Sequence, residues 1–184
     1  MDCINNVDIL NNMPWLSQKR KDHIASTAIC AGELAVRYCP ELENKAFIAG
    51  MYHDCAKGLE SELLKKYDIG IFADYYSTAH APLGAMLARD AFFINDEQIL
   101  QAIYWHCTGR SNMSTLEKIV FLADAIEPLR EYPNVDKIRS SACISLDDGV
   151  FAYLDNLVSY LKRDGIKINP YTLQLYNDYL TSEV

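Results

Sequence analysis

The sequence is short of positive charge. It has 17 lysine and arginine residues against 25 aspartates and glutamates, which gives a formal net charge of −8 over 184 residues. Because proteins that bind DNA or RNA need an electropositive surface, we do not expect a nucleic acid as the main partner. A small anionic ligand remains compatible with this charge if a metal ion and a few cations form a local positive pocket.

Long apolar runs and the marks of an export signal are also missing. Half of the residues are hydrophobic, but no run approaches the roughly 20 apolar residues that cross a bilayer. The first residues lack the basic and apolar regions of a secretion signal. We therefore expect a cytoplasmic protein without a membrane partner.

The six cysteines form no Cys-x-x-Cys pair and no dense cluster. In a chain without an export signal, this pattern is typical of free and mostly buried thiols. Cys55 and Cys107 adjoin candidate metal ligands, which makes oxidation conceivable, but simple packing is the more common role of such residues.

Alternation of polar and apolar residues, the mark of a strand, is nearly absent, and helical signals dominate. Ser17 is a candidate N-cap, residues 114–117 form a capping-box pattern, and Pro82 is expected to open a helix. We expect helices over about residues 17–38, 44–54, 61–67, 82–92, 96–106, 114–124, 145–163 and 171–180. The chain is thus expected to be one all-α domain over residues 1–184, with a motif-bearing core at about 17–130 and C-terminal helices at about 145–182.

All four histidines fall into one ordered series with two aspartates. The series is His23, His53, Asp54, His80, His106 and Asp124. Each member lies in or at the end of a segment that is expected to be helical, so a helical core could bring all six together. A single histidine is more often a hydrogen-bonded core or surface residue, but this series of imidazoles and carboxylates suits Fe, Mn, Co or Zn. We therefore predict a metal site.

Three cations accompany these candidate ligands, three residues before His23, three after Asp54 and six after Asp124. They are Arg20, Lys57 and Arg130. A cation beside a metal ion is unfavourable unless an anion lies between them, and a phosphate would satisfy both. Each cation could instead be solvated or paired with Glu127, but together they favour phosphate chemistry.

The series resembles the H…HD…D pattern of the HD-domain metal-dependent phosphohydrolases. Longer motifs resemble the YqeK family of bacterial symmetrical diadenosine tetraphosphate hydrolases, over about residues 17–177. These motifs are Arg20-x-x-His23, His53-Asp54-x-x-Lys57, His80-x-Pro82-x-Gly84-Ala85, His106-x-Thr108-Gly109 and Ala123-Asp124-x-Ile126-Glu127-Pro128-x-Arg130. One departure is Cys107, where the family pattern leads us to expect a threonine.

The resemblance implies a helical bundle with an iron-type metal site in its core, held by His23, His53, Asp54 and Asp124, in which Co, Mn or Zn could replace Fe. It also implies that His80 and His106 face the phosphates or a second ion. The reaction would split the tetraphosphate bridge of diadenosine tetraphosphate, or of a related dinucleoside polyphosphate, into two ADP molecules by attack of a metal-activated water.

The resemblance also implies roles for individual residues. The expected catalytic residues are Asp54, Lys57, His80 and His106. The expected substrate contacts are Arg20, His23, Asp54, Lys57, His80, His106, Thr108, Asp124, Arg130, Pro170 and Thr172. A C-terminal pattern of Pro170, Thr172 and Tyr176-Asn177 would help to hold the nucleoside.

Two alternatives stay open. One is another HD enzyme, namely a nucleoside 5′-monophosphatase, a guanosine tetraphosphate hydrolase or a di-iron oxygenase that uses all four histidines. The other is a non-catalytic nucleotide-binding module that takes an ADP-like ligand and keeps a structural metal. A homodimer is also open, since Tyr75, Tyr76, Phe92 and Phe93 could form its patch, although core positions are the more common role of such residues.

Overall fold

The computed structural model describes the backbone of residues 6–182 and the side chains of residues 9–181. Within this range the chain forms helices and short 3-10 turns and has no strand, which confirms the predicted all-α class. In chain order the elements are α1 (Asn6–Asn11), α2 (Gln18–Tyr38), η1 (Pro40–Leu42), α3 (Glu43–Tyr52), α4 (Glu60–Leu63), η2 (Gly70–Asp74), α5 (Tyr76–Phe92), α6 (Glu97–Trp105), α7 (Thr115–Ile126), α8 (Val135–Ala142), α9 (Leu146–Arg163) and α10 (Pro170–Ser182).

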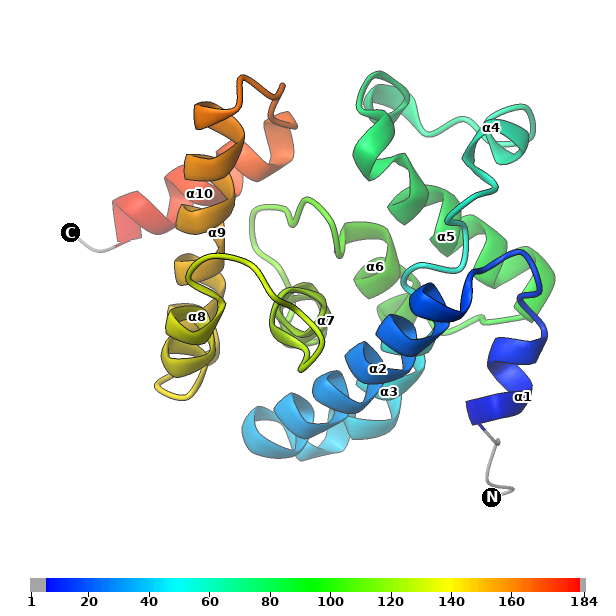
Figure 1. The fold of residues 1–184 in the computed structure, drawn as a ribbon, viewed down its shortest axis with the longest axis horizontal. Coiled ribbons are helices and arrows are strands. Elements are labelled where there is room, and N and C mark those ends of the chain that lie inside the picture. Colours follow the sequence, from blue (N-terminus) through cyan, green and yellow to red (C-terminus); the bar gives the residue numbers. More distant parts are fainter. Residues whose placement is uncertain (1–5, 183–184) are drawn as a thin grey trace.

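Helix α7 lies at the centre of the molecule (Figure 1). It packs against α2, α3 and α6 on one side and against α8 and α9 on the other. Its side chains are buried almost all round, from Leu116 to Ile126. A helix with this pattern can only be stable when other helices cover it on every face. The last turn of α7 therefore lies deep in the fold, where a polar side chain needs partners.

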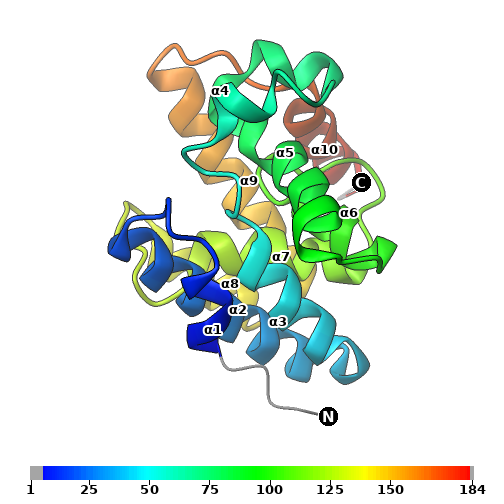
Figure 2. The same cartoon turned by 90° about the vertical axis from the view of Figure 1, so that its right-hand side faces the viewer.

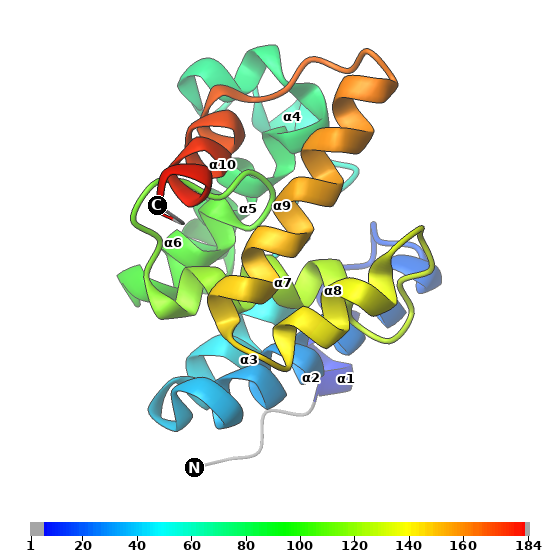
Figure 3. The ribbon, with the colours of Figure 1, turned by 90° about the vertical axis from the view of Figure 1, so that its left-hand side faces the viewer.

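The remaining helices surround α7. In Figures 1 and 2, α4 and the start of α5 lie at the end of the molecule opposite α2 and α3, while the last turns of α5 run toward α1. Figure 3 shows α9 crossing the opposite face, and α9 packs against both α8 and α10. Three parts of the chain meet beside α7: the turn that ends α3, the turn that ends α6, and the first turns of α5. This junction holds the site described below.

The predicted helix starts are confirmed where a side chain caps the helix. Ser17 Oγ accepts the N–H of Arg20 at the start of α2, and Ser114 and Glu117 form the complete capping box of α7. Asp96 and Ser145 cap α6 and α9 in the same way. Each cap satisfies backbone N–H groups that have no partner within the helix, so the signal is local and can be read from the sequence.

The prediction that Pro82 opens a helix is wrong. Helix α5 begins six residues earlier, at Tyr76, and Pro82 lies inside it. Proline in a helix interior costs about 3 kcal/mol, because it removes a hydrogen bond and crowds the preceding turn. That turn nevertheless carries Ala79 and His80, which are both buried. The burial of this turn against the core outweighs the local penalty.

Three further elements differ from the expectation. Helices α1 and α8 were not predicted, and α4 is shorter than the expected helix at residues 61–67. Helix α8 follows Asn134, whose backbone is left-handed (φ 72°) and whose side chain makes no capping bond. Because no capping side chain marks this start, packing against α7 and α9 is the feature that stabilises α8.

Two of the four aromatic residues that were expected in the core are on the surface. Phe93 is 79% exposed and Tyr76 is 60% exposed, while Phe92 is partly buried against the core cluster that contains Ile24 and Met51. Phe93 is the left-handed residue (φ 55°) that ends α5, so its side chain leaves the buried face of the helix. The core assignment was therefore wrong for Phe93 and Tyr76.

The five described cysteines are free, as predicted, but they are not mostly buried. Only Cys30 and Cys55 lie in the core, while Cys143 is exposed and Cys39 and Cys107 are partly accessible. Burial raises the pKa of the Cys30 thiol to about 12, so this thiol stays protonated at neutral pH. Cys3 lies outside the described residues.

Among the helices between residues 6 and 182, none combines the length and the apolar character needed to span a membrane.

Candidate metal centre

The six residues of the histidine and aspartate series lie in one cluster, which we call the His/Asp cluster. Five helix segments supply it: His23 from the middle of α2, His53 and Asp54 from the end of α3, His80 from α5, His106 from the end of α6, and Asp124 from the last turn of α7. All but Asp124 are buried. The helical core thus brings together residues that lie up to 101 positions apart in the sequence (124 − 23).

Four donor atoms form the first half of the cluster. His23 Nε2 lies 3.3 Å from His53 Nε2, 3.8 Å from Asp54 Oδ2 and 3.0 Å from Asp124 Oδ1. His53 Nε2 lies 3.5 Å from Asp54 Oδ2 and 3.7 Å from Asp124 Oδ1. A tetrahedral ion with bonds of 2.0–2.1 Å separates such donors by about 3.4 Å. The distance between the two ring nitrogens, and the distances from each nitrogen to the two carboxylate oxygens, therefore suit the binding of a divalent ion.

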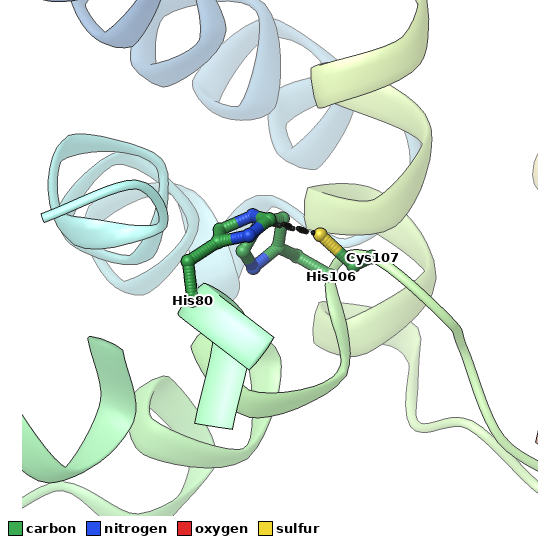
Figure 4. A group of neighbouring side chains, drawn as sticks. All are labelled: His80, His106 and Cys107. Atoms are coloured by element: carbon green, nitrogen blue, oxygen red, sulfur yellow. Dashed lines mark hydrogen bonds between the residues drawn. The ribbon is translucent and has the colours of Figure 1, made fainter. Parts of the chain in front are cut away.

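The second half of the cluster faces the other oxygen of Asp54. Asp54 Oδ1 lies 3.2 Å from His80 Nε2 and 3.7 Å from His106 Nε2. Cys107 Sγ lies 3.0 Å from His80 Nε2 and 3.2 Å from His106 Nε2. Figure 4 shows these two rings and the thiol converging. The carboxylate of Asp54 thus stands between two groups of donors, with one oxygen toward each.

Hydrogen bonds behind three rings direct their Nε2 atoms into the cluster. The Nδ1 atoms of His53 and His106 each lie 2.7 Å from a main-chain carbonyl oxygen, at Gly50 and Ile103 respectively. A carbonyl oxygen can only accept, so Nδ1 carries the proton and Nε2 keeps its lone pair. In both cases the ring also satisfies a carbonyl in the last turn of a helix. These rings are therefore oriented as metal ligands require.

His23 has a carboxylate behind it instead. Its Nδ1 lies 3.1 Å from Glu127 Oε1, and Glu127 is 1% exposed. Burial would raise the pKa of Glu127, but hydrogen bonds from Ser26 and from the Leu129 N–H hold it below its usual value. An ionised Glu127 accepts the Nδ1 proton of His23 and makes Nε2 a stronger donor to a metal.

Two arginines neutralise the carboxylates of the cluster. Arg20 Nη1 lies 2.5 Å from Asp54 Oδ2, and Arg130 pairs with Asp124 Oδ1. Burial would raise the pKa of Asp54, but its electrostatic interaction with His53 and its hydrogen bonds with the surrounding imidazoles hold it well below its usual range. Burial likewise opposes ionisation of Asp124, and its hydrogen bond with His23 lowers its pKa. Both carboxylates are therefore charged at neutral pH.

Four other residues were expected at the site, and the structure places them around the cluster: Lys57, Thr108, Pro170 and Thr172. Lys57 follows Asp54 by one turn and forms no ion pair with any described residue. Thr108 is buried, and its carbonyl oxygen accepts the hydroxyl of Thr172 at 3.0 Å. Pro170 is the exposed first residue of α10. Thr172 thus joins α10 to the turn after His106, and its hydroxyl binds this turn instead of facing the cluster.

A cavity of about 580 Å³ opens beside Arg130. Its walls include Tyr132, Tyr153, Tyr160 and Arg163. These residues come from the loop after α7 and from α9, so no sequence pattern marks them, and only the fold places them beside Arg130. Their aromatic surface next to a cation is suited to a planar ring that carries phosphate.

Replacing Glu127 with glutamine should weaken metal binding by about 10- to 100-fold, because the uncharged amide no longer strengthens His23 as a donor. A titration of metal-free protein with Co²⁺ measures this affinity. Glu131→Gln is the matched control, since Glu131 lies on the same loop and is exposed. Equal affinities for the two variants would show that the contact between His23 and Glu127 is not part of the metal centre.

Comparison with known proteins identifies similar chains. The HD domain model matches residues 20–129, a range that contains the whole His/Asp cluster. The chain is 39% identical, over 92% of its length and 94% of the relative, to a symmetrical bis(5′-nucleosyl)-tetraphosphatase from Halalkalibacterium halodurans. It is 33% identical to the protein of the same name from Bacillus subtilis, over 88% of this chain and 90% of the relative.

A solved structure is also similar. It is described as a predicted HD superfamily hydrolase involved in NAD metabolism from Clostridium acetobutylicum. Its TM-score is 0.85, with 34% sequence identity over 97% of this chain and 96% of that one. The arrangement of helices around the cluster is therefore that of a known hydrolase superfamily.

Proposed function

Because the chain belongs to the HD-domain family, and to its YqeK branch, we propose that it hydrolyses diadenosine tetraphosphate symmetrically to two molecules of ADP. The main observation behind this proposal is that Asp54 lies between two groups of metal-binding side chains. Arg20 pairs with Asp54, and Arg130 pairs with Asp124. The close relatives that bear the name of a symmetrical tetraphosphatase support the choice of substrate.

The first group of donors is proposed to hold the metal ion. Its members are His23, His53, Asp54 and Asp124, in which each carboxylate lies within 4 Å of both rings. Iron is our first choice, and Co, Mn or Zn fit the same nitrogen and oxygen donors. When bound, a divalent ion supplies Lewis-acid chemistry, which polarises a phosphoryl oxygen and makes a bound water more acidic. The geometry supports this assignment, since the donor spacing suits a tetrahedral ion.

The cations are proposed to bind the polyphosphate. Arg20 and Arg130 are each about one-third exposed in their side chains, so they can reach an anion at the mouth of the site. A metal ion on Asp54 and Asp124 would offset the charge that these arginines now neutralise, which frees them to bind phosphate. Lys57 has no competing carboxylate among the described residues. Their charge would stabilise the negative charge that develops on the phosphoryl oxygens and on the departing ADP.

The proton steps are proposed to involve Asp54 and the rings of His80 and His106. Asp54 Oδ1 can take a proton from the attacking water, and His80 Nε2 lies 3.2 Å from that oxygen. Positive charge gathered between His80 and His106, as a proton or as a second ion, would stabilise the leaving diphosphate. Thr172, through Thr108, would keep the turn after His106 in place.

The nucleosides are proposed to bind outside the charged centre. The cavity beside Arg130 has three tyrosines in its walls, which can cover the face of a base while Arg130 contacts the phosphate. Pro170 and Thr172, at the start of α10, are proposed contacts for the second nucleoside. The polyphosphate of a dinucleoside substrate would thus lie at the metal centre, with one nucleoside in the cavity beside Arg130 and the other at the start of α10.

The test is to incubate protein loaded with iron or cobalt with diadenosine tetraphosphate and to separate the nucleotides by anion exchange. We expect ADP as the sole product, and removal of the metal with a chelator should abolish turnover. ATP and AMP together would show attack at a different phosphorus. Absence of turnover with any of the candidate metals would reject this substrate and favour another nucleotide as the ligand.

A further inference from the structure

The carbonyl oxygens at the end of α7 are bonded by side chains from outside the helix. The last carbonyls of a helix have no N–H partner within it, and Pro128, which follows the end of α7, has no N–H to offer. The donors that take their place are Arg130 Nε on the Asp124 carbonyl at 2.7 Å, the Tyr132 hydroxyl on that of Ala125 at 2.9 Å, and Arg139 Nε on that of Ile126 at 3.0 Å. One of these donors comes from a separate helix, α8, which packs against α7 (Figure 3).

The guanidinium of Arg139 also bonds the backbone beyond the end of α7. Its Nη2 donates to the carbonyl oxygens of Glu127 at 2.9 Å and of Arg130 at 3.1 Å. Among the described residues, no other side chain bonds a main-chain carbonyl between residues 126 and 133. A guanidinium presents its donors in a fixed planar fork, so it can hold three carbonyls at once. The compact ammonium of a lysine cannot span the same three acceptors.

The backbone segment held in this way carries two residues that face the metal centre. Glu127 Oε1 lies 3.1 Å from His23 Nδ1, and Arg130 pairs with Asp124. The Arg130 N–H also donates to the Glu127 carbonyl oxygen at 3.0 Å, so the two residues belong to one tight turn. A shift of this turn would move the acceptor behind His23 and the cation beside Asp124 together.

Arg139 itself lies outside the His/Asp cluster. It forms no hydrogen bond or ion pair with the described members of that cluster. The carboxylate with which it pairs is that of Asp136, one turn earlier on α8, and Asp136 is exposed. An ion pair at the surface contributes little to stability, so the bonds to the three carbonyls are the contacts through which Arg139 acts.

We propose that Arg139 is a positioning residue, which holds residues 126–130 so that Glu127 faces His23 and Arg130 faces the phosphate of the substrate. It touches neither the metal nor the substrate. The contact of Arg130 with phosphate rests on the proposed function, whereas the hold on the turn can be measured without a ligand. If Arg139 acts through Arg130, its effect on ligand binding disappears once the cation at residue 130 is removed.

The first test is hydrogen exchange of the metal-free protein, read by mass spectrometry of the peptide that covers residues 127–134. Arg139→Lys keeps the charge but loses the fork, so these amides should exchange about 10-fold faster, since a lost hydrogen bond changes a local opening equilibrium by roughly that factor. Lys137→Arg, at an exposed position of the same helix, is the matched control and should change nothing. Unchanged exchange in Arg139→Lys, or an equal rise in α2, overturns the proposal.

The second test measures the affinity for ADP by isothermal titration calorimetry at saturating Co²⁺. Arg139→Lys should weaken binding by about 10-fold, because a displaced Arg130 meets the phosphate poorly. In the Arg130→Gln background the same change should alter the affinity by less than about 2-fold. Equal effects in both backgrounds overturn the action through Arg130. A wild-type chain that neither binds ADP nor hydrolyses diadenosine tetraphosphate overturns the proposed function, and the exchange measurement then decides the hold on the turn by itself.

Discussion

Replacing Asp54 with asparagine will remove most of the bound metal and lower the turnover of diadenosine tetraphosphate by about three orders of magnitude, or about 4 kcal/mol in the activation free energy. Asparagine has nearly the same shape, so the change leaves no cavity. It does remove the charge that faces His23 and His53 through Oδ2 and His80 and His106 through Oδ1. Among the described residues, Asp54 is the carboxylate that lies within 4 Å of all four rings.

Two measurements check this expectation. Metal content is determined after gel filtration, and turnover is followed by anion exchange under saturating metal. Asp90→Asn is the matched control, because Asp90 is an exposed carboxylate that pairs with Lys66 far from the site, and it should change neither value. An Asp54→Asn protein with full activity would reject both the metal site and the proposed reaction.

Replacing Gly50 with alanine will destabilise the protein by about 2–3 kcal/mol. An added Cβ would lie 2.6 Å from Ala28 Cα and 3.0 Å from Ala28 N, where α3 crosses α2. Both atoms belong to the backbone, so the two helices must move apart. The carbonyl of Gly50 also receives the Nδ1 proton of His53, so this movement should weaken metal binding as well.

The matched control for Gly50→Ala is Gly32→Ala. Gly32 also lies inside a helix, α2, but nothing is within 4 Å of its Cβ position. Alanine there should stabilise the protein by about 0.5–1 kcal/mol, because it restricts the unfolded chain more than glycine does. Urea unfolding of the metal-free proteins measures both changes. Equal stabilities for Gly50→Ala and the wild type would show that the crossing of α2 and α3 can relax.

The parts of the fold that were predicted from the sequence are those that have local causes. Ser17, Asp96, Ser114 and Ser145 satisfy backbone groups within three residues of themselves, so each helix start could be read directly. The prediction from Pro82 was wrong because the preference of proline for the first turn of a helix is outweighed by the burial of the preceding turn. Helix α8 was not predicted because no capping side chain marks its start.

In the candidate site, too, the features with a local sequence signal were predicted and those that depend on helix packing were not. The order of histidines and aspartates, and the resemblance it carries, singled out the residues that the fold brings together. The contact of His23 with Glu127 joins residues 104 positions apart, and the direction of the Cys107 thiol depends on how α5 and α6 pack. Such contacts follow from the packing of whole helices, so no local pattern could have predicted them.

The hydrogen bonds behind the histidines make the site unequally robust to mutation. The rings of His53 and His106 are directed by main-chain carbonyl oxygens, and a substitution at residue 50 or 103 does not remove a carbonyl. The ring of His23 depends on a single side chain, which one codon change can delete. A substitution at residue 103 that keeps α6 in place therefore leaves the ring of His106 directed, whereas residue 50 is restricted to glycine by the crossing of α2 and α3. Behind His23, a change of Glu127 alone removes the hydrogen-bond acceptor.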